Sequence, residues 1–291
     1  MEWLVMSLAL SLAAGLSAEP PPVFFQAHRG GLDEVPENTL AAYEHAWAIP
    51  GAVPEVDLCT TADGVVVCMH DDTPERTTDA PEPWAGKKMS EIPLDEVRKW
   101  DAGKKFDAKY AEERVPTLDE VLDRVKGRPE RQVYLDLKNI DLEKLRDRLR
   151  EYGVEKQVIF VHGSPAMCAR LHALYEGART MTWLSGPPDK IKRDFAKMCE
   201  RGFRGISQIQ FHLPPLTTSP QITYAFDDVY IKEAVRLTRA AGVDLQLRPF
   251  AFDAPSLRSL LDAGVHWYVT DAPKSFAECV RAAQTLPAER H

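Results

Sequence analysis

The chain has 291 residues, of which 44% are hydrophobic and 27% are charged, and it carries a formal net charge of −8. This composition is that of an ordinary folded protein of one or two domains. An acidic chain without a run rich in Lys and Arg lacks the basic track that neutralises phosphates, so nucleic acid is not expected as a partner.

Residues 1–18 are expected to be a signal peptide and not part of the fold. The stretch 3–16 is almost uninterrupted apolar sequence, and residues 15–18 include the small side chains that a signal peptidase accepts. The run is short for a membrane span, but Glu2 stands where a basic residue is usual, so a retained membrane anchor is the alternative. We therefore expect a secreted or periplasmic protein without stable membrane insertion, in which residues 19–291 form one domain.

Short β-rich runs alternate with amphipathic helical stretches along the rest of the chain. Such alternation predicts parallel strands joined by helical crossovers. The expected strands are Val23–Ala27, Pro54–Leu58, Val65–His70, Gln132–Leu137, Gln157–Val161, Arg179–Leu184, Gly205–Gln210, Val243–Arg248 and His266–Thr270. The expected helices include Leu40–Ala48, Leu142–Tyr152, Ala166–Glu176, Lys190–Arg201, Asp228–Ala241, Ala254–Ala263 and one opened by the capping-box pattern Thr117 to Glu120.

Nine strands are one more than a closed (β/α)8 barrel needs, and the third strand has a local explanation. No crossover helix fits between it and Pro54–Leu58, whereas Asp63-Gly64 is a strong two-residue hairpin turn. We therefore expect an α/β protein of the TIM-barrel type in which Val65–His70 returns antiparallel as a β-hairpin excursion after the second strand. Thr73 to Pro116 is expected to be a short lid-like insertion with a helix near Ser90–Trp100.

The expected turn also fixes which residues of the hairpin face each other. A two-residue turn pairs Asp57 with His70, and Glu55 then shares their face because side chains alternate along a strand. Inward-facing acids are costly to bury unless a cation neutralises them, and carboxylate oxygens suit Ca²⁺ or Mg²⁺. The alternative is that both acids point outward into solvent, as acids on half-exposed strands often do.

The same register places two of the five cysteines, Cys59 and Cys68, opposite each other. Side chains come closest at non-hydrogen-bonded positions of a hairpin, so a cross-strand disulfide is possible in an oxidising compartment. Two buried free thiols are the alternative.

Chemically active residues also stand at the carboxyl ends of other expected strands. His28 and Arg29 close the first strand, Asp136 and Lys138 close the fourth, and Asp271 follows the last. Barrel enzymes build their active sites at this end of the barrel from the βα loops. The sequence therefore predicts one site that gathers these residues.

An ordered set of short motifs runs along the chain: His28-Arg29-Gly30, Pro36-Glu37-Asn38-Thr39, Glu55-x-Asp57, Thr61-Ala-Asp63-Gly64, His70-Asp71, Pro116-Thr117-Leu118, Asp136-x-Lys138, Gly264-Val265 and Thr270-Asp271-x-Pro273. Taken in this order, they resemble the glycerophosphodiester phosphodiesterase family over nearly all of the chain after the expected signal peptide. Two departures are visible: Asp136 replaces the usual Glu, and Pro249-Phe250-Ala251-Phe252 replaces the usual Trp-Thr-Val-Asn.

The resemblance implies a fold, a reaction and a set of roles. The implied reaction is hydrolysis of a small-molecule glycerophosphodiester to sn-glycerol 3-phosphate and an alcohol. The implied roles are a divalent cation site (Ca²⁺ or Mg²⁺) at Glu55, Asp57 and Asp136, an acid/base pair at His28 and His70, and phosphate contacts at Arg29 and Lys138. These residue types suit the chemistry, because Arg and Lys neutralise phosphate oxygens and imidazole exchanges protons near neutral pH.

Several alternatives stay open at this stage. The residues do not assign which histidine is the base, or whether a substrate hydroxyl or water attacks the phosphorus. A phospholipase-D-like or phospholipase-C-like hydrolase of lysophospholipids or phosphoinositides would use the same residues, and a non-catalytic phosphoester-binding barrel is the alternative outside enzymes. The headgroup and the oligomeric state are not indicated.

Other polar residues have mainly structural interpretations. Glu37-Asn38-Thr39 precedes a helix and is expected to cap it. Asp71 either orients His70 or starts a turn. Gln208, Gln210 and His212 share one face near another strand end and are candidates for the pocket wall.

Overall fold

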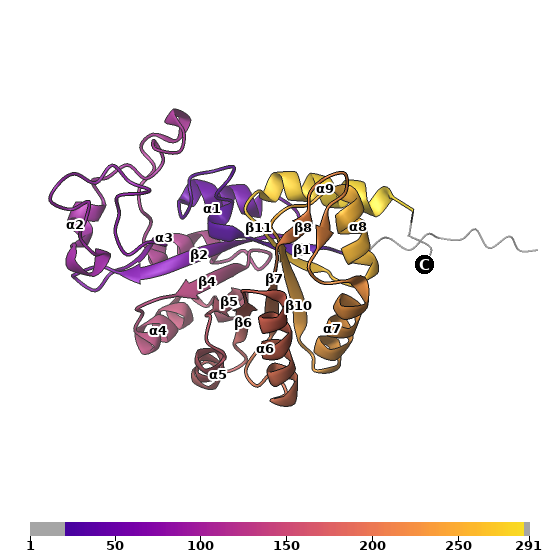
Figure 1. The fold of residues 1–291 in the computed structure, drawn as a ribbon. Helices are drawn as coiled ribbons and strands as arrows, with labels where there is room; N and C mark the ends of the chain where they lie inside the picture. The colour runs from indigo at the N-terminus through magenta and orange to yellow at the C-terminus, as the bar shows by residue number, and fades with distance from the viewer. Residues whose placement is uncertain (1–20, 288–291) are drawn as a thin grey trace, which may run out of the picture.

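Eight parallel strands close into a barrel in the computed structural model, which describes residues 21–287 (Figure 1). The strands are β1 (Phe24–Ala27), β2 (Ala52–Thr60), β4 (Val133–Leu137), β5 (Val158–Val161), β6 (Arg179–Leu184), β7 (Gln208–Leu213), β10 (Asp244–Pro249) and β11 (Trp267–Thr270). Their order is β1-β11-β10-β7-β6-β5-β4-β2, and pairing of β1 with β2 closes the ring. The predicted TIM barrel is confirmed, whereas the predicted signal peptide, residues 1–18, lies outside the described residues.

Helices cover the outside of this barrel, as Figure 1 shows. They are α1 (Leu40–Trp47), α3 (Leu118–Val125), α4 (Leu142–Tyr152), α5 (Pro165–Leu174), α6 (Pro188–Glu200), α7 (Asp228–Ala240), α8 (Ala254–Asp262) and α9 (Pro273–Thr285). The capping box that opens α3 is present, with Thr117 accepting from the Glu120 backbone N–H and Glu120 accepting from that of Thr117. Helix α9 was not among the expected helices, although Phe276, Val280 and Ala283 give it a buried face.

The hairpin after β2 runs as expected, but its register differs by one residue. β3 (Val66–Cys68) is antiparallel to β2, with Cys68 opposite Leu58. The Thr61 N–H donates to the Val65 carbonyl, so the loop has three residues and ends at Gly64, whose φ of 83° is left-handed. A three-residue hairpin loop typically ends in such a residue, and this turn type shifts every pair by one position.

The shifted register separates the two cysteines that a two-residue turn would have paired. Cys68 packs in the buried layer between the barrel and its helices, whereas Cys59 packs against the segment that follows the hairpin. Both thiols are free. The structure therefore contains no disulfide between them.

Residues 71–116 form an excursion at the left of Figure 1. It contains the short helix α2 (Leu94–Val97), shorter than the helix expected near Ser90–Trp100, and two 3-10 turns, Met89–Glu91 and Ala108–Tyr110. Together with β3 it encloses a small apolar core of its own, formed by Val67, Met69, Met89, Ile92, Val97, Trp100, Ala102 and Val115. The insertion is thus a packed unit and not an extended loop.

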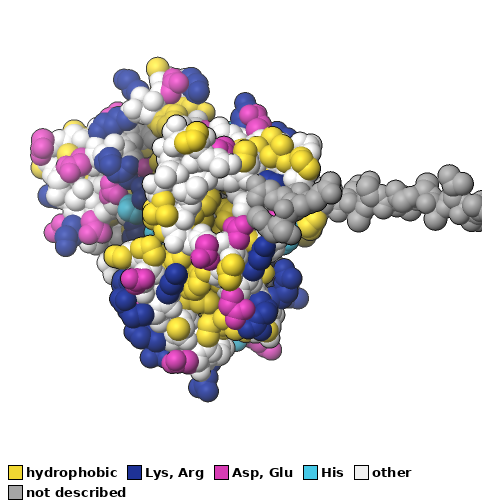
Figure 2. Space-filling view, turned by 45° about the vertical axis from the view of Figure 1, so that its right-hand side comes forward, with side chains coloured by type: hydrophobic (Ala, Val, Ile, Leu, Met, Phe, Trp, Pro, Cys, Tyr) yellow, Lys and Arg dark blue, Asp and Glu magenta, His cyan; other side chains and the backbone are white. Residues whose placement is uncertain are grey.

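A second hairpin, β8 (Pro215–Thr217) with β9 (Thr223–Tyr224), follows β7 and was not expected from the sequence. Charged side chains of both signs are interspersed with hydrophobic ones on the face shown in Figure 2. Within residues 21–287, no helix combines the length and the apolar character that crossing a membrane requires.

Candidate active site

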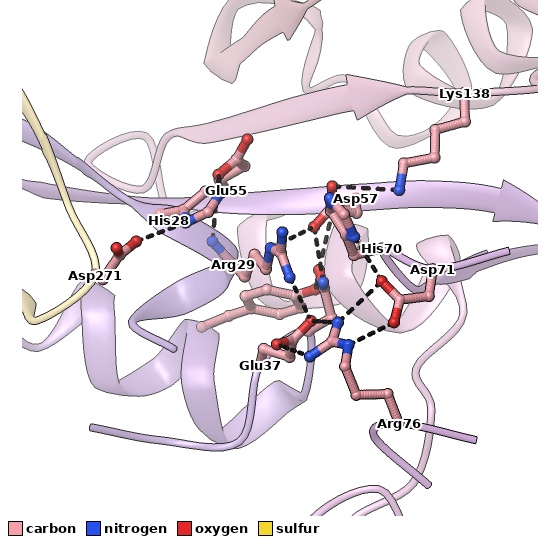
Figure 3. Close-up of polar contacts among 12 residues, drawn as sticks. His28, Arg29, Glu37, Glu55, Asp57, His70, Asp71, Arg76, Lys138 and Asp271 are labelled. Carbon is pink, nitrogen blue, oxygen red and sulfur yellow. Dashed lines mark hydrogen bonds and ion pairs between the residues drawn. The ribbon is translucent and has the colours of Figure 1, made fainter. Parts of the chain in front are cut away.

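A cavity of about 300 Å³ opens at the carboxyl ends of the barrel strands. Its lining contains six of the seven residues for which the sequence implied catalytic, metal or phosphate roles, namely His28, Arg29, Glu55, Asp57, His70 and Asp136. The seventh, Lys138, lies at its edge, with Nζ 3.8 Å from Asp57 Oδ1. Figure 3 shows that side chains from β2, from the residues that follow β1, β3 and β4, and from the excursion converge here.

The chain turns sharply directly after β1, and this turn brings His28 and Arg29 into the cavity. Arg29, Gly30 and Gly31 have φ values of 53°, 87° and 118°, three left-handed residues in succession. A Cβ on Gly30 would lie 2.6 Å from the Ala42 Cβ, so the close approach of α1 requires glycine there. The two glycines of the sequence therefore shape the backbone that presents both side chains.

Three carboxylates come together because two of them stand on neighbouring strands. Asp57 on β2 is the register partner of Asp136 on β4, and Glu55 lies two residues before Asp57 on the same face. Glu55 and Asp57 are buried, and one oxygen of each acid lies within 4.8 Å of the others. Burial, and after it the charges of Glu55 and Asp57, raises the pKa of Asp136 well above its usual range, so ionisation of all three acids is unfavourable here.

Asn38 fixes the orientation of Asp57. Its Nδ2 donates to Asp57 Oδ2 at 2.8 Å, and its Oδ1 accepts from the Asp57 backbone N–H at 3.0 Å and from the Tyr43 hydroxyl at 3.0 Å. Of the expected capping trio, only Thr39 caps α1, by accepting from the Ala42 backbone N–H. Asn38 and Glu37 belong to the site instead.

His28 is held by Asp271, which directly follows the neighbouring strand β11, and by Arg248 on β10, the strand beyond it. Its Nδ1 lies 2.6 Å from Asp271 Oδ1 and 2.9 Å from Arg248 Nη2, which also donates to Asp271 Oδ1 at 3.0 Å. Arg248 can only donate and the Asp271 carboxylate can only accept, so Nδ1 can bond to just one of them. Because the contact with Asp271 is the shorter one, we assign a proton to Nδ1, which donates it to Asp271, while Arg248 donates to Asp271 as well. This leaves Nε2, 3.8 Å from Glu55 Oε2, on the cavity side.

The charge on Asp271 is secured by the same contacts. Burial alone would raise the pKa of Asp271, but the hydrogen bond from His28 and the charges of His28 and Arg248 outweigh it and lower the pKa. The carboxylate therefore stays ionised beside His28.

His70 has an equivalent partner from its own segment. Its Nδ1 lies 2.7 Å from Asp71 Oδ1, which resolves the role of Asp71 as an orienting contact. Asp71 in turn accepts from Arg76 Nε at 2.5 Å and from Nη2 at 3.0 Å. The hydrogen bond from Arg76, together with that from His70, holds the pKa of Asp71 well below its usual range.

The far wall of the cavity comes from β6, β7 and β10. Trp183, Gln210, His212 and Arg248 line it, whereas Gln208 lies deeper in the barrel and accepts from the Tyr134 hydroxyl at 2.7 Å. Burial, aided by the charges of Arg248 and His28, lowers the pKa of His212 to about 4, so this imidazole is neutral near pH 7. The expectation that Gln210 and His212 line the pocket is therefore confirmed.

Four polar residues of the site were not predicted from the sequence. Glu37 and Asn38 were expected only to cap a helix, and Arg76 and Arg248 were given no role. Arg248 carried a usable signal, because it closes an expected strand at the end of the barrel where sites form. Arg76 carried none, since it stands in a non-periodic segment whose path only the structure defines.

Comparison with known proteins agrees with this geometry. A model of the glycerophosphoryl diester phosphodiesterase family matches residues 28–275. A glycerophosphodiester phosphodiesterase of Caldanaerobacter subterraneus subsp. tengcongensis is 39% identical over 139 residues, an alignment that covers 46% of this chain and only 55% of that relative. A glycerophosphodiester phosphodiesterase of Bacillus subtilis is 28% identical over 277 residues, with 88% of this chain and 86% of the relative covered.

Solved structures of similar fold point the same way. The crystal structure of a glycerophosphodiester phosphodiesterase from Agrobacterium tumefaciens superposes with a TM-score of 0.69 at 24% identity, over 88% of this chain and 99% of that one. A phosphodiesterase from Oleispira antarctica, in complex with the product sn-glycerol-3-phosphate, gives a TM-score of 0.63 at 23% identity, over 89% and 96%. At these identities the likeness shows the common barrel fold.

Proposed function

Because this chain belongs to the glycerophosphoryl diester phosphodiesterase family and is an enzyme of that type, we propose that it cleaves glycerophosphodiesters with two histidines as acid and base beside a divalent cation. The products are sn-glycerol 3-phosphate and an alcohol. One observation carries the proposal: of the three imidazoles that line a single cavity, two are held through Nδ1 by a carboxylate, and three clustered acids line the same cavity.

The three acids fit a divalent cation. Within the part of the chain described, the Lys and Arg side chains paired with these acids are Lys138 and Arg29, which stand 3.8 and 3.9 Å from Asp57 oxygens and make no hydrogen bond to them. Buried carboxylates this close need more positive charge than that, and oxygen donors are what Ca²⁺ and Mg²⁺ prefer. Glu55, Asp57 and Asp136 would hold the ion, which when bound supplies charge neutralisation to the phosphate.

The two histidines provide the proton transfers. With Nδ1 bound to Asp271, His28 presents Nε2 to the cavity, and His70, with Nδ1 bound to Asp71, has its own Nε2 available. One imidazole accepts the proton of the attacking hydroxyl or water through Nε2. The other donates its Nε2 proton to the oxygen of the leaving alcohol, so that the P–O bond breaks without releasing an alkoxide.

Arg29 and Lys138 are the phosphate contacts in this proposal. Arg29 Nε is buried and has no hydrogen-bond partner among residues 21–287, so a donor is left available beside the acids. A guanidinium contacts phosphate oxygens with directed N–H groups, whereas the ammonium of Lys138 acts as a point charge. The O. antarctica phosphodiesterase, which shares the fold, binds the product expected here.

The test is release of sn-glycerol 3-phosphate from glycerophosphocholine in Ca²⁺, in Mg²⁺ and in EDTA. We expect activity with a cation and none in EDTA. The double variant Glu55→Gln with Asp57→Asn should lose both activity and calorimetric cation binding. Unchanged cation affinity in that variant would refute the metal site, and no product with any cation would refute the reaction.

Export is a separate part of the proposal, and it rests on the apolar stretch 3–16 followed by small residues. Mass analysis of the protein recovered from an export-competent host should show a chain that begins near residue 19. A cell-associated protein that retains residues 1–18 would contradict export by cleavage.

A further inference from the structure

We propose that Arg76 is a positioning residue that couples the excursion to both the acid/base and the phosphate-binding parts of the site. The inference rests on the proposed function, because Arg76 would set the positions of both His70, a proposed acid or base, and Arg29, a proposed phosphate contact. Arg76 touches neither residue's cavity-facing atoms; it acts through two carboxylates, Asp71 and Glu37, that orient them (Figure 3).

One side of the Arg76 guanidinium holds the partner of His70. Nε and Nη2 donate to the two oxygens of Asp71 at 2.5 and 3.0 Å. Asp71 Oδ1 lies 2.7 Å from His70 Nδ1, so the chain of contacts runs from Arg76 to the imidazole through a single carboxylate. Because His70 follows a strand of only three residues, this contact sets its ring orientation more than the sheet does.

The other side of the same guanidinium holds the partner of Arg29. Nη1 and Nη2 each donate to a different oxygen of Glu37, both at 2.7 Å. Glu37 Oε1 also accepts from Arg29 Nη1 at 3.0 Å. Burial opposes ionisation of Glu37, but the hydrogen bond from Arg76 and the charges of both arginines outweigh it and lower its pKa.

Only arginine can make this double contact. Its planar guanidinium carries donors on two edges and can therefore bind two carboxylates side by side, whereas the ammonium of lysine is one point charge. Arg76 is half exposed, and a single exposed ion pair contributes little to stability. Four directed hydrogen bonds to two site carboxylates are better explained by positioning than by stability.

The test uses steady-state kinetics and inhibition by sn-glycerol 3-phosphate to separate two branches: the contacts from Arg76 through Asp71 to His70, and those from Arg76 through Glu37 to Arg29. Arg76→Met should lower kcat about 100-fold, the cost of a catalytic group displaced by about 1 Å, and should also weaken product binding about tenfold, the loss of roughly one charge-assisted contact. Asp71→Asn should reproduce mainly the loss in kcat. Glu37→Gln should reproduce mainly the loss in product affinity. Arg76→Lys should recover only a small part of either.

Arg98→Met is the matched control. Arg98 also stands in the excursion and makes a two-pronged contact, donating to both oxygens of Glu120 at 2.9 Å, but Glu120 is not part of the cavity lining. This variant should keep kcat and product affinity while it lowers thermal stability slightly. If Arg76→Met behaved like Arg98→Met, the positioning role would be refuted. An inactive wild-type enzyme would instead refute the proposed function, so the two failures are distinguishable.

A double-mutant cycle gives an independent check. If Arg76 acts through Asp71, the losses in kcat of Arg76→Met and Asp71→Asn should not multiply in the double variant. Fully multiplicative losses would show that Arg76 acts by another route, and would overturn the branch to His70.

Discussion

His28 and His70 face the same cavity but are anchored by different parts of the molecule. His28 follows β1, and its partners Arg248 and Asp271 stand at the ends of β10 and β11, the next strands in the closed sheet. His70 follows β3 at the edge of the barrel, and its partner Asp71 belongs to the excursion. The side chain of His28 is 14% exposed and that of His70 is 37% exposed.

The two histidines are therefore positioned by structural units that we expect to differ in stability. The hydrogen-bonded barrel fixes the His28 half, so that half persists as long as the barrel is folded. The His70 half depends on the small core of the excursion and on Arg76, both of which can fail while the barrel stays intact. Activity is therefore expected to be more fragile than the fold.

The largest effect is expected on removal of either imidazole. His28→Ala and His70→Ala should each lower kcat by about 10²- to 10⁴-fold, the usual contribution of general acid or base catalysis. Cation affinity measured by calorimetry should be kept, because neither histidine is an expected ligand. Added imidazole should restore activity to His70→Ala better than to His28→Ala, because the His70 position is more open to solvent. Near-normal turnover in either variant would end the acid/base assignment, and equal rescue would contradict the asymmetry.

An intermediate effect is expected from the core of the excursion. Trp100 is 3% exposed there, and Trp100→Ala should destabilise this unit by about 3–5 kcal/mol. As His70 loses its position, kcat should fall by up to about 10²-fold. Hydrogen exchange should rise within residues 71–116, while the main thermal transition of the barrel moves little.

Phe160→Ala is the comparison for this prediction. Phe160 is 2% exposed in the layer between the barrel and its helices. Its loss should lower the main thermal transition while kcat well below that transition is kept. If both variants unfolded the whole chain in one transition with similar loss of activity, the two halves would not be separable.

The parts of the molecule that the sequence predicted are those governed by periodic patterns. Alternation of strands and helices gave the barrel, and the ends of expected strands gave His28, Asp57 and Asp136. His70 was placed correctly for a partly wrong reason: the hairpin register is shifted by one residue, but the chain leaves the sheet after Cys68 and the ring still reaches the cavity.

What the sequence could not predict depends on backbone geometry outside the strands. A two-residue type I′ turn needs a positive φ at both Asp63 and Gly64, whereas here only Gly64 has one, and this gives the three-residue turn. The amino-acid sequence was compatible with both turns. Arg76 meets Glu37, 39 positions away, only because the excursion folds back on the barrel. Asn38 was expected to cap a helix because Glu37-Asn38-Thr39 stands where a helix begins. Thr39 does cap that helix, whereas Asn38 binds Asp57, and position before a helix alone does not distinguish these two roles.

The smallest expected effect concerns pH, and it belongs to the barrel side of the cavity. Burial, with the charges of Arg248 and His28, lowers the pKa of His212 to about 4 from an ordinary value of 6.5. Between these values the unfolded chain binds a proton that the folded chain does not, so this group makes the fold less stable as the pH falls from 6.5 toward 4.

His212→Gln removes this pH-dependent contribution to stability. Two pH units below 6.5, a fully buried group would contribute about 2.5 kcal/mol, but His212 is only partly buried and solvent screening reduces this to roughly 1 kcal/mol. Thermal unfolding at pH 7 and pH 4.5 should therefore show a drop in Tm that is smaller in the variant by about 2–4 °C. Because the comparison is made across pH within each protein, any change of baseline stability in the variant cancels. Equal decreases in Tm in the two proteins would mean that His212 is protonated in the folded protein at pH 4.5. The β7 side of the cavity would then be more accessible to water than the burial of His212 indicates.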